Sequence, residues 1–209
     1  MSVFHNNILG GAAGQTGDAD AAPYQIDRSL RFTSGDSAYL NRTPSSAGNR
    51  RTFTWSSWVK RSSFGSQQGI FSSFAGAHPT TGLIFDAGDT FTFFNYNGSS
   101  YDLQLTSSAV FRDPSAWYHL VIAVDTTQAT ASNRIKIYVN GEQITAFGTS
   151  TYPSSNFELD WNSATEHNIG KHVNSLDGYL TEVHFVDSQQ LAPTDFGEYD
   201  DNNVWQPKE

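Results

Sequence analysis

The chain has 209 residues, with 12 lysines and arginines against 21 aspartates and glutamates, and a formal net charge of −9. An acidic surface repels phosphate backbones, so the composition argues against nucleic acid as a partner. Cysteine is absent, which excludes a disulfide scaffold and a thiolate metal site.

Residues 1–22 differ in composition from the rest of the chain. They are rich in glycine and alanine and carry the apolar side chains Phe4, Ile8 and Leu9 near their start. Such a segment has little surface to bury and much backbone entropy to lose. We predict a flexible N-terminal arm, with these three side chains as an attachment or oligomerisation device, followed by one domain over residues 23–209. The alternative interpretation is a terminal tail without a partner.

Two further features of the sequence concern membranes. Met1–Gln15 has no basic start and no long apolar segment, so it does not resemble a signal peptide. No apolar run approaches the roughly 20 residues that span a bilayer. We expect no membrane insertion.

From Tyr24 onward the composition is typical of strands, with many Thr, Ser, Phe, Tyr and Val residues and few strong helix formers. Short segments of alternating or continuous apolar residues follow one another between turn residues. In chain order, the first predicted strands cover residues 29–32, 38–42, 52–60, 69–74, 82–86, 90–94 and 101–105.

The second half of the chain continues this pattern, with predicted strands over residues 117–125, 134–139, 143–147, 167–170 and 178–187. Asn140-Gly141 is the strongest hairpin motif, and we predict a two-residue turn with positive φ at both positions. Residues 192–197 predict a single helical turn. Short strands at regular spacing are typical of an all-β sandwich or barrel.

Three segments resemble parts of laminin-G-like domains. Residues 55–60 resemble the opening strand of these domains, residues 117–121 with 137–141 resemble their central hairpin, and residues 177–183 resemble their closing strand. The segments follow the order of that family over residues 24–209. The resemblance implies a concanavalin A-like jelly roll, a sandwich of two antiparallel sheets.

A narrower resemblance links the chain to virion proteins of marine tailed phages. Residues 4–7, 41–50, 111–119 and 204–208 are similar to the laminin-G-like module of these proteins. The resemblance implies a non-enzymatic structural module on the virion surface, as capsid decoration or in a tail fibre. Its partners would be phage capsid or tail proteins and copies of itself, for example in a trimer. It would be made in the host cytoplasm without a signal peptide.

Carbohydrate binding is the alternative function, with host polysaccharide as the ligand. It needs an aromatic platform beside amides and carboxylates. The polar stretch from Asn156 to His167 contains one such aromatic, Trp161, which we predict to be accessible. The candidate binding residues are Tyr152, Trp161, Asn162, His167 and His172. The competing interpretation of Trp161 is an interface or a half-buried loop aromatic.

A glucanase-like enzyme is a third hypothesis. Glucanases of this superfamily carry Glu-x-Asp-x-Glu on one strand, where alternation places all three carboxylates on one sheet face. The corresponding segment here, Glu158–Asn162, has an amide at its third position, so the acid/base would be missing. No Gly-x-Ser-x-Gly nucleophile motif is present, although residue types alone leave a Ser-His-Asp triad open. We predict no catalytic residues and no enzymatic activity.

The other tryptophans and the aspartates complete the candidate residues. Trp55 and Trp58 are three apart on one strand, so they face opposite sides of the sheet. Trp117 is predicted in the core, and Trp205 closes the sandwich or meets a neighbour. Aspartates near predicted turns match no calcium-loop pattern; these are Asp86, Asp89, Asp102, Asp160 and Asp177. We expect no cofactor, with calcium as the one ion that the resemblance leaves open.

Overall fold

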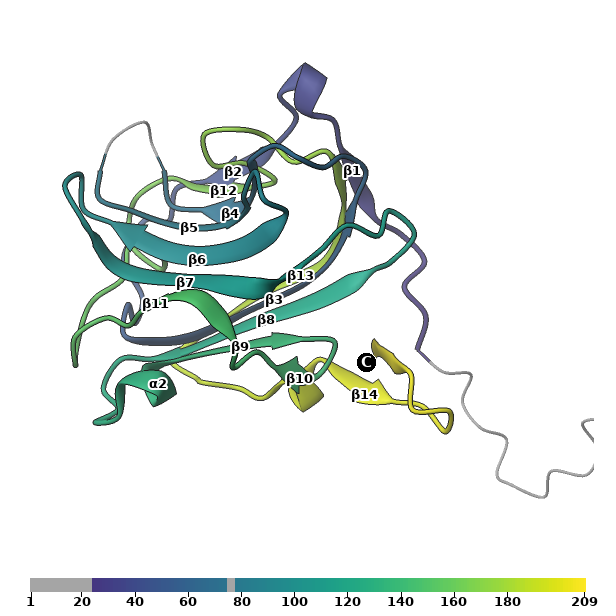
Figure 1. The fold of residues 1–209 in the computed structure, drawn as a ribbon. Coiled ribbons are helices and arrows are strands. Elements are labelled where there is room, and N and C mark those ends of the chain that lie inside the picture. Colours follow the sequence, from purple (N-terminus) through teal and green to yellow (C-terminus); the bar gives the residue numbers. More distant parts are fainter. Residues whose placement is uncertain (1–23, 75–77) are drawn as a thin grey trace, which may run out of the picture.

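Two antiparallel β-sheets packed face to face form the domain in the computed structural model, which describes residues 24–74 and 78–209 (Figure 1). The predicted two-sheet antiparallel jelly roll is confirmed. The arm predicted over residues 1–22, with Phe4, Ile8 and Leu9, lies outside the described residues.

One sheet has six strands, in the order β1 (Leu30–Phe32), β13 (Gly178–Asp187), β3 (Thr52–Arg61), β8 (Tyr118–Asp125), β9 (Ile135–Val139) and β10 (Glu142–Gln143). The other has seven, in the order β11 (Phe147–Thr151), β7 (Tyr101–Val110), β6 (Thr90–Tyr96), β5 (Thr80–Phe85), β4 (Gln68–Ser72), β12 (His167–Ile169) and β2 (Leu40–Arg42). The shorter elements are η1 (Ser34–Asp36), α2 (Ala131–Arg134), η2 (Pro193–Asp195), β14 (Gly197–Tyr199) and β15 (Trp205–Pro207).

Strand alternation places the core between the sheets. On β3, Phe53 and Trp55 are fully buried in this core, whereas Trp58 lies on the opposite face and stacks on His119 of β8. The predicted division of Trp55 and Trp58 between the two faces is therefore confirmed. Trp117 is half-buried rather than in the core, because it precedes β8 by one residue and contacts Tyr179 on the outer side.

The Asn-Gly hairpin forms as the sequence predicts. Asn140 and Gly141 have φ values of 49° and 83°, and they join β9 to β10 through the pair Val139 and Glu142. The strand predicted over residues 143–147 is wrong: β10 ends at Gln143, and the chain crosses to the other sheet to form β11.

The C-terminal segment returns over the outer face of the six-stranded sheet. Figure 1 shows β14 beside β10, and the Tyr199 hydroxyl donates to Glu142 at 2.8 Å. Trp205 of β15 packs against His119 at a ring distance of 5.9 Å. This segment gives β8 a second covered face, which explains why its sequence is almost continuously apolar.

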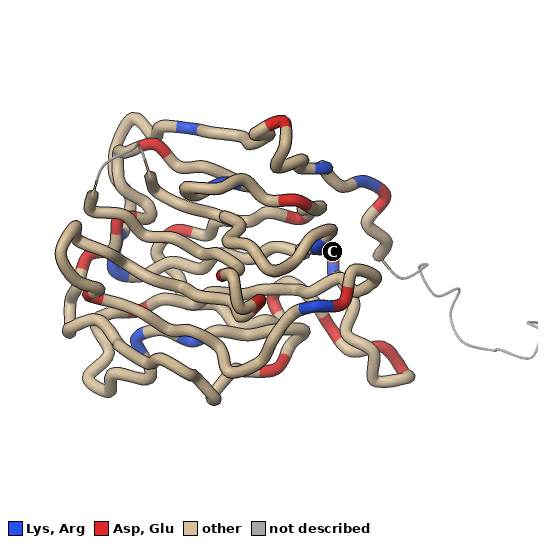
Figure 2. Tube along the Cα trace, turned by 45° about the horizontal axis from the view of Figure 1, so that its top comes forward, with Lys and Arg blue, Asp and Glu red and all other residues tan. Residues whose placement is uncertain are grey.

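Acidic and basic residues are interspersed along the described trace (Figure 2). None of the described helices is long and apolar enough to cross a membrane.

Candidate ligand-binding pocket

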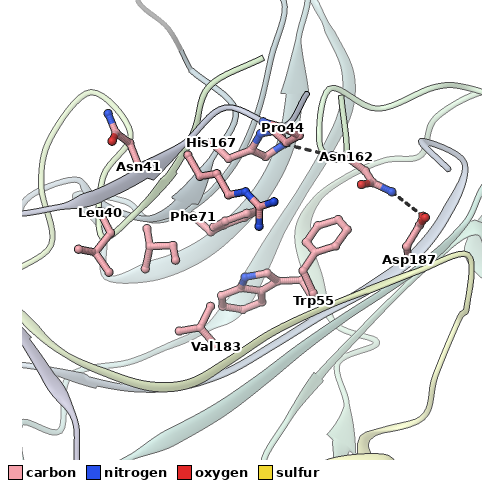
Figure 3. Close-up of a pocket in the computed structure, with 12 residues that line it drawn as sticks. Leu40, Asn41, Pro44, Trp55, Phe71, Asn162, His167, Val183 and Asp187 are labelled. Carbon is pink, nitrogen blue, oxygen red and sulfur yellow. Dashed lines mark hydrogen bonds between the residues drawn. The ribbon is translucent and has the colours of Figure 1, made fainter. Parts of the chain in front are cut away.

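A pocket of about 550 Å³ opens between the sheets where β13 faces β2 and β12 (Figure 3). This volume is within the usual range for small-molecule sites. We call it the edge pocket; its lining residues are Leu40, Asn41, Arg42, Pro44, Trp55, Phe71, Asn162, His167, Ile169, Val183, Phe185 and Asp187.

The floor of the edge pocket is aromatic and aliphatic. Val183 and Phe185 alternate on one face of β13, and Phe71 stacks on Trp55 at a ring distance of 5.9 Å. The Trp55 Nε1–H is buried without a hydrogen-bond partner in the described part of the chain. An unpaired buried donor costs free energy, so a ligand oxygen that reached this floor would gain a favourable contact. Figure 3 shows the Trp55 indole at the base of the pocket.

Asn162 forms a fixed amide at one side of the opening. Its Nδ2 donates to Asp187 Oδ1 at 2.6 Å (Figure 3), and also to the Asn49 carbonyl at 3.1 Å. The backbone of Gly48 passes so close that a Cβ there would lie 2.5 Å from the amide nitrogen. Asn162 has a φ of 63°, a left-handed conformation that Asn tolerates better than most residues. The loop is therefore built around this amide.

His167 is held beside Asn162 as a neutral imidazole. Its Nε2 accepts from the Asn162 N–H at 3.1 Å, and its Nδ1–H donates to the Thr165 carbonyl at 2.8 Å. These partners place the proton on Nδ1. Burial lowers the pKa of His167. With both nitrogens engaged, His167 shapes the wall of the pocket and has no lone pair left to act as a base.

Arg42 and Asn41 supply polar groups from the edge strand β2. Both are exposed, and Asn41 Nδ2 donates to Glu166 at 3.4 Å. Arg42 forms no ion pair within residues 24–74 and 78–209. The pocket therefore combines an apolar floor with unpaired guanidinium donors at its opening.

The structure brings together two of the five predicted binding residues, Asn162 and His167. Trp161 points the other way, into the core: its ring is fully buried, lies 4.7 Å from that of Phe71, and donates from Nε1 to the Thr81 carbonyl at 2.8 Å. The prediction of an accessible Trp161 platform is wrong, because the loop that carries it uses Leu159 and Trp161 to close the end of the sandwich.

Tyr152 and His172 lie apart from the edge pocket. Tyr152 is half-buried and packs against the core, and burial raises its pKa. His172 lies on the outer face of the seven-stranded sheet, over Gly82 and between Phe74 and Phe94.

The carboxylates of the glucanase-like segment are not arranged for catalysis. Residues 158–162 form a loop rather than the alternating strand that this motif requires. Glu158 pairs with Arg50 and Arg51. Asp160 pairs with Arg50 and accepts from Asn95 at 2.6 Å, and burial raises its pKa. Both carboxylates serve to fix the loop.

A Ser–His pair exists on the outer face of the six-stranded sheet, but its proton is in the wrong place for nucleophilic catalysis. His119 Nε2 lies 2.8 Å from Ser56 Oγ, and Trp205 Nε1 donates to His119 Nδ1 at 3.0 Å. An indole nitrogen only donates, so Nδ1 accepts and Nε2 carries the proton. His119 therefore donates to Ser56 and cannot remove the hydroxyl proton.

Two of the aspartates near turns, Asp86 and Asp89, are engaged by other side chains of the domain. Asp89 is buried against Arg61 and Arg112 at 2.9 and 2.8 Å; burial favours its neutral form, but hydrogen bonds from Gly65 and both arginines lower its pKa to about 2. Asp86 accepts from the Thr90 hydroxyl. No group of three or more His, Asp or Glu side chains converges among the described residues.

Sequence reasoning missed the residues that β2 and β13 bring to the pocket, chiefly Arg42, Val183 and Phe185. They lie on predicted strands, but nothing in their local pattern shows that these strands meet. The one feature that could have drawn attention to this segment is Arg42, a charged residue on the otherwise uncharged strand predicted over residues 38–42.

Three comparisons place this geometry among known proteins. A protein-family model, Laminin_G_3, described as the concanavalin A-like lectin/glucanases superfamily, matches residues 32–193. No curated protein sequence matches the chain.

Solved structures with the same fold share little sequence with the chain. Domain 4 of AbnA, a GH43 extracellular arabinanase from Geobacillus stearothermophilus in complex with arabinotriose, has a TM-score of 0.59 at 14% identity, over 83% of this chain and 76% of that one. Trypanosoma rangeli sialidase in complex with the inhibitor DANA has a TM-score of 0.52 at 13% identity, over 82% and 27%. Mouse laminin alpha1 chain domains LG4-5 have a TM-score of 0.50 at 14% identity, over 78% and 42%. The chain belongs to the concanavalin A-like lectin/glucanases superfamily.

Proposed function

We propose that the protein is a non-enzymatic carbohydrate-binding module that holds a saccharide in the edge pocket. One observation carries this proposal: the guanidinium of Arg42, which forms no ion pair in the described part of the chain, lines the same pocket as an apolar floor. A sugar ring has the matching character, with an apolar C–H face and a hydroxyl edge. The floor residues Val183 and Phe185 suit the ring face, and Arg42 and Asn41 suit the hydroxyls.

The fold supports the ligand class only by analogy. Domain 4 of AbnA was solved with arabinotriose, so a domain of this fold holds an oligosaccharide in that case. The absence of enzymatic activity is part of the proposal. It is supported by the pairing of Glu158 and Asp160 with arginines and by the proton that His119 donates to Ser56.

Calorimetric titration of the full chain with a panel of soluble oligosaccharides tests the proposal. Arg42→Ala and Asn41→Ala remove exposed side chains, so the fold should persist while affinity falls by at least about tenfold, the equivalent of about 1.4 kcal/mol. Arg31→Ala is the matched control, because Arg31 is an exposed arginine on the edge strand β1 and does not line the pocket. Equal affinity of the wild type and Arg42→Ala for every bound oligosaccharide would place the site elsewhere.

We further propose that the module is displayed on a tailed-phage virion, with residues 1–22 as its attachment to capsid or tail proteins. The support is the resemblance of residues 41–50 and three other segments to virion modules, and this segment also supplies Arg42 to the edge pocket. Weak attachment by each arm would be strengthened when several copies bind together, as in a trimer.

Co-sedimentation with particles that lack the protein tests the display proposal. The full chain should decorate them, and a triple variant with Phe4→Asp, Ile8→Asp and Leu9→Asp should not. The two proteins should have the same melting temperature, because the strands that form the sandwich begin only at Leu30 in the sequence. Full occupancy by the triple variant would show that attachment resides on the domain itself.

A further inference from the structure

The outer face of the six-stranded sheet carries two adjoining cavities of about 290 and 320 Å³, both lined by Trp58 and Pro207. They lie between the segment that leads into β1 and the C-terminal strand β15. We infer that together they form a second saccharide site, distinct from the edge pocket and suited to a neutral oligosaccharide. We call it the outer cleft.

One side of the outer cleft is a rigid aromatic wall. Trp58 stacks on His119 with ring centroids 4.9 Å apart and planes at 24°, and His119 stacks on Trp205 at 5.9 Å and 22°. A Cβ at Gly141 or at Gly197 would lie 2.6 Å from the Trp205 ring. The backbone at these two glycines therefore packs directly against the indole and restricts its movement. A wall fixed before binding loses little conformational entropy when a ligand packs on it.

Trp117 extends this wall toward solvent. It is half-buried, lines the larger cavity with Trp58 and Trp205, and lies 6.4 Å from the Tyr179 ring. Three indoles thus line one small cavity, with Trp58 and Trp205 buried at 7% and 9% exposure and Trp117 more accessible. The C–H faces of sugar rings pack on flat apolar surfaces such as that of Trp117.

The other side of the cleft presents an oriented carboxylate, Glu182. The Tyr24 hydroxyl donates to its Oε1 at 3.1 Å, and His184 Nε2 lies 3.0 Å from its Oε2. A carboxylate has about four acceptor positions, so two remain. The Glu182 and His184 side chains are 31% and 46% exposed, which leaves these positions open to ligand hydroxyls.

The backbone at Glu182 is strained in the way expected at functional positions. Its φ is 49°, and among the described strands it is the only non-glycine residue inside a strand with positive φ. It sits at the β-bulge between Thr181 and His184, where two residues of β13 oppose one of β3. Such a bulge re-aims a side chain at an energetic cost.

Local charge selects the ligand class. Three acidic residues, Glu182, Asp195 and Glu209, line the smaller cavity against one lysine, Lys208. A sugar acid would therefore be repelled, and a neutral sugar with donor hydroxyls would be favoured. The inference shares its ligand class with the proposed function but uses none of the residues of the edge pocket.

Titration calorimetry of the full chain with neutral gluco-, manno-, xylo- and arabino-oligosaccharides tests the outer cleft. We expect a binding event that weakens at least tenfold in Trp117→Ala and in Glu182→Gly and is unchanged in Arg42→Ala. Glycine accepts a positive φ, so Glu182→Gly keeps the bulge and the melting temperature while it removes the carboxylate. Tyr101→Ala is the matched control, because Tyr101 is an exposed aromatic on the other sheet.

The outcomes separate the two sites. A binding event that Trp117→Ala and Glu182→Gly weaken and Arg42→Ala leaves unchanged supports the outer cleft, whereas a separate binding event that Arg42→Ala weakens supports the edge pocket. Binding that only Arg42→Ala weakens, or no binding of any neutral oligosaccharide, overturns the outer cleft. Retained affinity in Glu182→Gly would show that Glu182 has only a structural role in the bulge and would also overturn the inference.

Discussion

Replacement of His172 by phenylalanine should stabilise the protein and reduce its sensitivity to acid. His172 is 7% exposed and its ring lies 5.0 and 5.2 Å from those of Phe74 and Phe94. Both ring nitrogens are buried without a hydrogen-bond partner in the described part of the chain. Phenylalanine has a similar planar shape and removes both polar atoms, so at pH 7 we expect a gain in unfolding free energy of about 1 kcal/mol.

The acid response follows from the position of the pKa. Burial, with a smaller contribution from His78, lowers the pKa of His172 from its ordinary value of 6.5 to about 4. Between these values the unfolded chain binds more protons than the folded one, so folding stability is full above pH 6.5 and falls as the pH drops toward 4. The total effect is about 3 kcal/mol, of which about 2 kcal/mol is lost between pH 7 and pH 5.

A second substitution, His119→Phe, separates the effect of removing a titrating imidazole from the effect of removing its hydrogen bonds. Burial also lowers the pKa of His119 to about 4, so either substitution should flatten the pH dependence by a similar amount. His119 differs in having partners, since it accepts from Trp205 Nε1 and donates to Ser56. Its replacement leaves the indole N–H unpaired and should cost about 1–3 kcal/mol at pH 7. Urea unfolding of the wild type and of each variant, at pH 7 and at pH 5, measures how each substitution changes the unfolding free energy at the two pH values.

The outcome that refutes this reasoning is specific. If His172→Phe lowers stability at pH 7, or loses as much stability as the wild type between pH 7 and pH 5, then His172 has a polar partner or is solvated, and the burial argument fails.

Three further substitutions test the packing. Gly141→Val places a β-branched side chain at a φ of 83° and against the Trp205 ring, so it should cost at least about 1–3 kcal/mol; an unchanged melting temperature would contradict the turn assignment. Asp89→Asn leaves Arg61 buried without its counter-ion and should cost about 3–5 kcal/mol in urea unfolding, whereas a loss below about 1 kcal/mol would mean that Arg61 reaches water. Trp161→Phe removes the indole hydrogen bond and should lower the unfolding free energy by about 1–3 kcal/mol. It should not weaken oligosaccharide binding in calorimetry. Weaker binding by the folded variant would show that Trp161 contributes to the binding site.

Sequence reasoning succeeded where a local rule acts and failed where packing decides. The period of a strand is two residues, which is enough to separate Trp55 from Trp58, and positive φ at Asn140 follows from turn chemistry. Loops have no regular alternation of buried and exposed side chains. The polar neighbours of Trp161 therefore did not indicate that its ring would be buried in the core. The buried indole keeps its hydrogen bond by donating to a backbone carbonyl, an option that no neighbour in the sequence reveals.

The edge pocket could not be predicted because its parts meet only through topology. Arg42 and Phe185 lie on strands far apart in the sequence, on different sheets, and face each other because β12 and β2 extend the seven-stranded sheet past β4. A pattern within either strand predicts which residues face inward, but not which strand lies opposite. Asn162 and His167 were placed in one candidate set because they are five residues apart in one polar stretch, and the structure shows that they bond to each other.

Strand β13 serves both candidate sites, and a single inserted residue makes this possible. Leu180, Val183 and Phe185 all face the core side, although Leu180 and Val183 are three apart, which regular alternation forbids. The extra residue is Glu182, since the pairs Thr181–Trp58 and His184–Ser56 leave two residues of β13 opposite Ser57.

Deletion of Glu182 should therefore restore regular alternation without turning any other side chain to the opposite face. The shortened protein should keep its melting temperature or gain from the loss of the strained residue, by about 1 kcal/mol or more. It should retain binding at the edge pocket and lose binding at the outer cleft. A deletion variant that fails to fold would show that Glu182 is part of the regular register, and that the separation of the two sites along β13 has another origin.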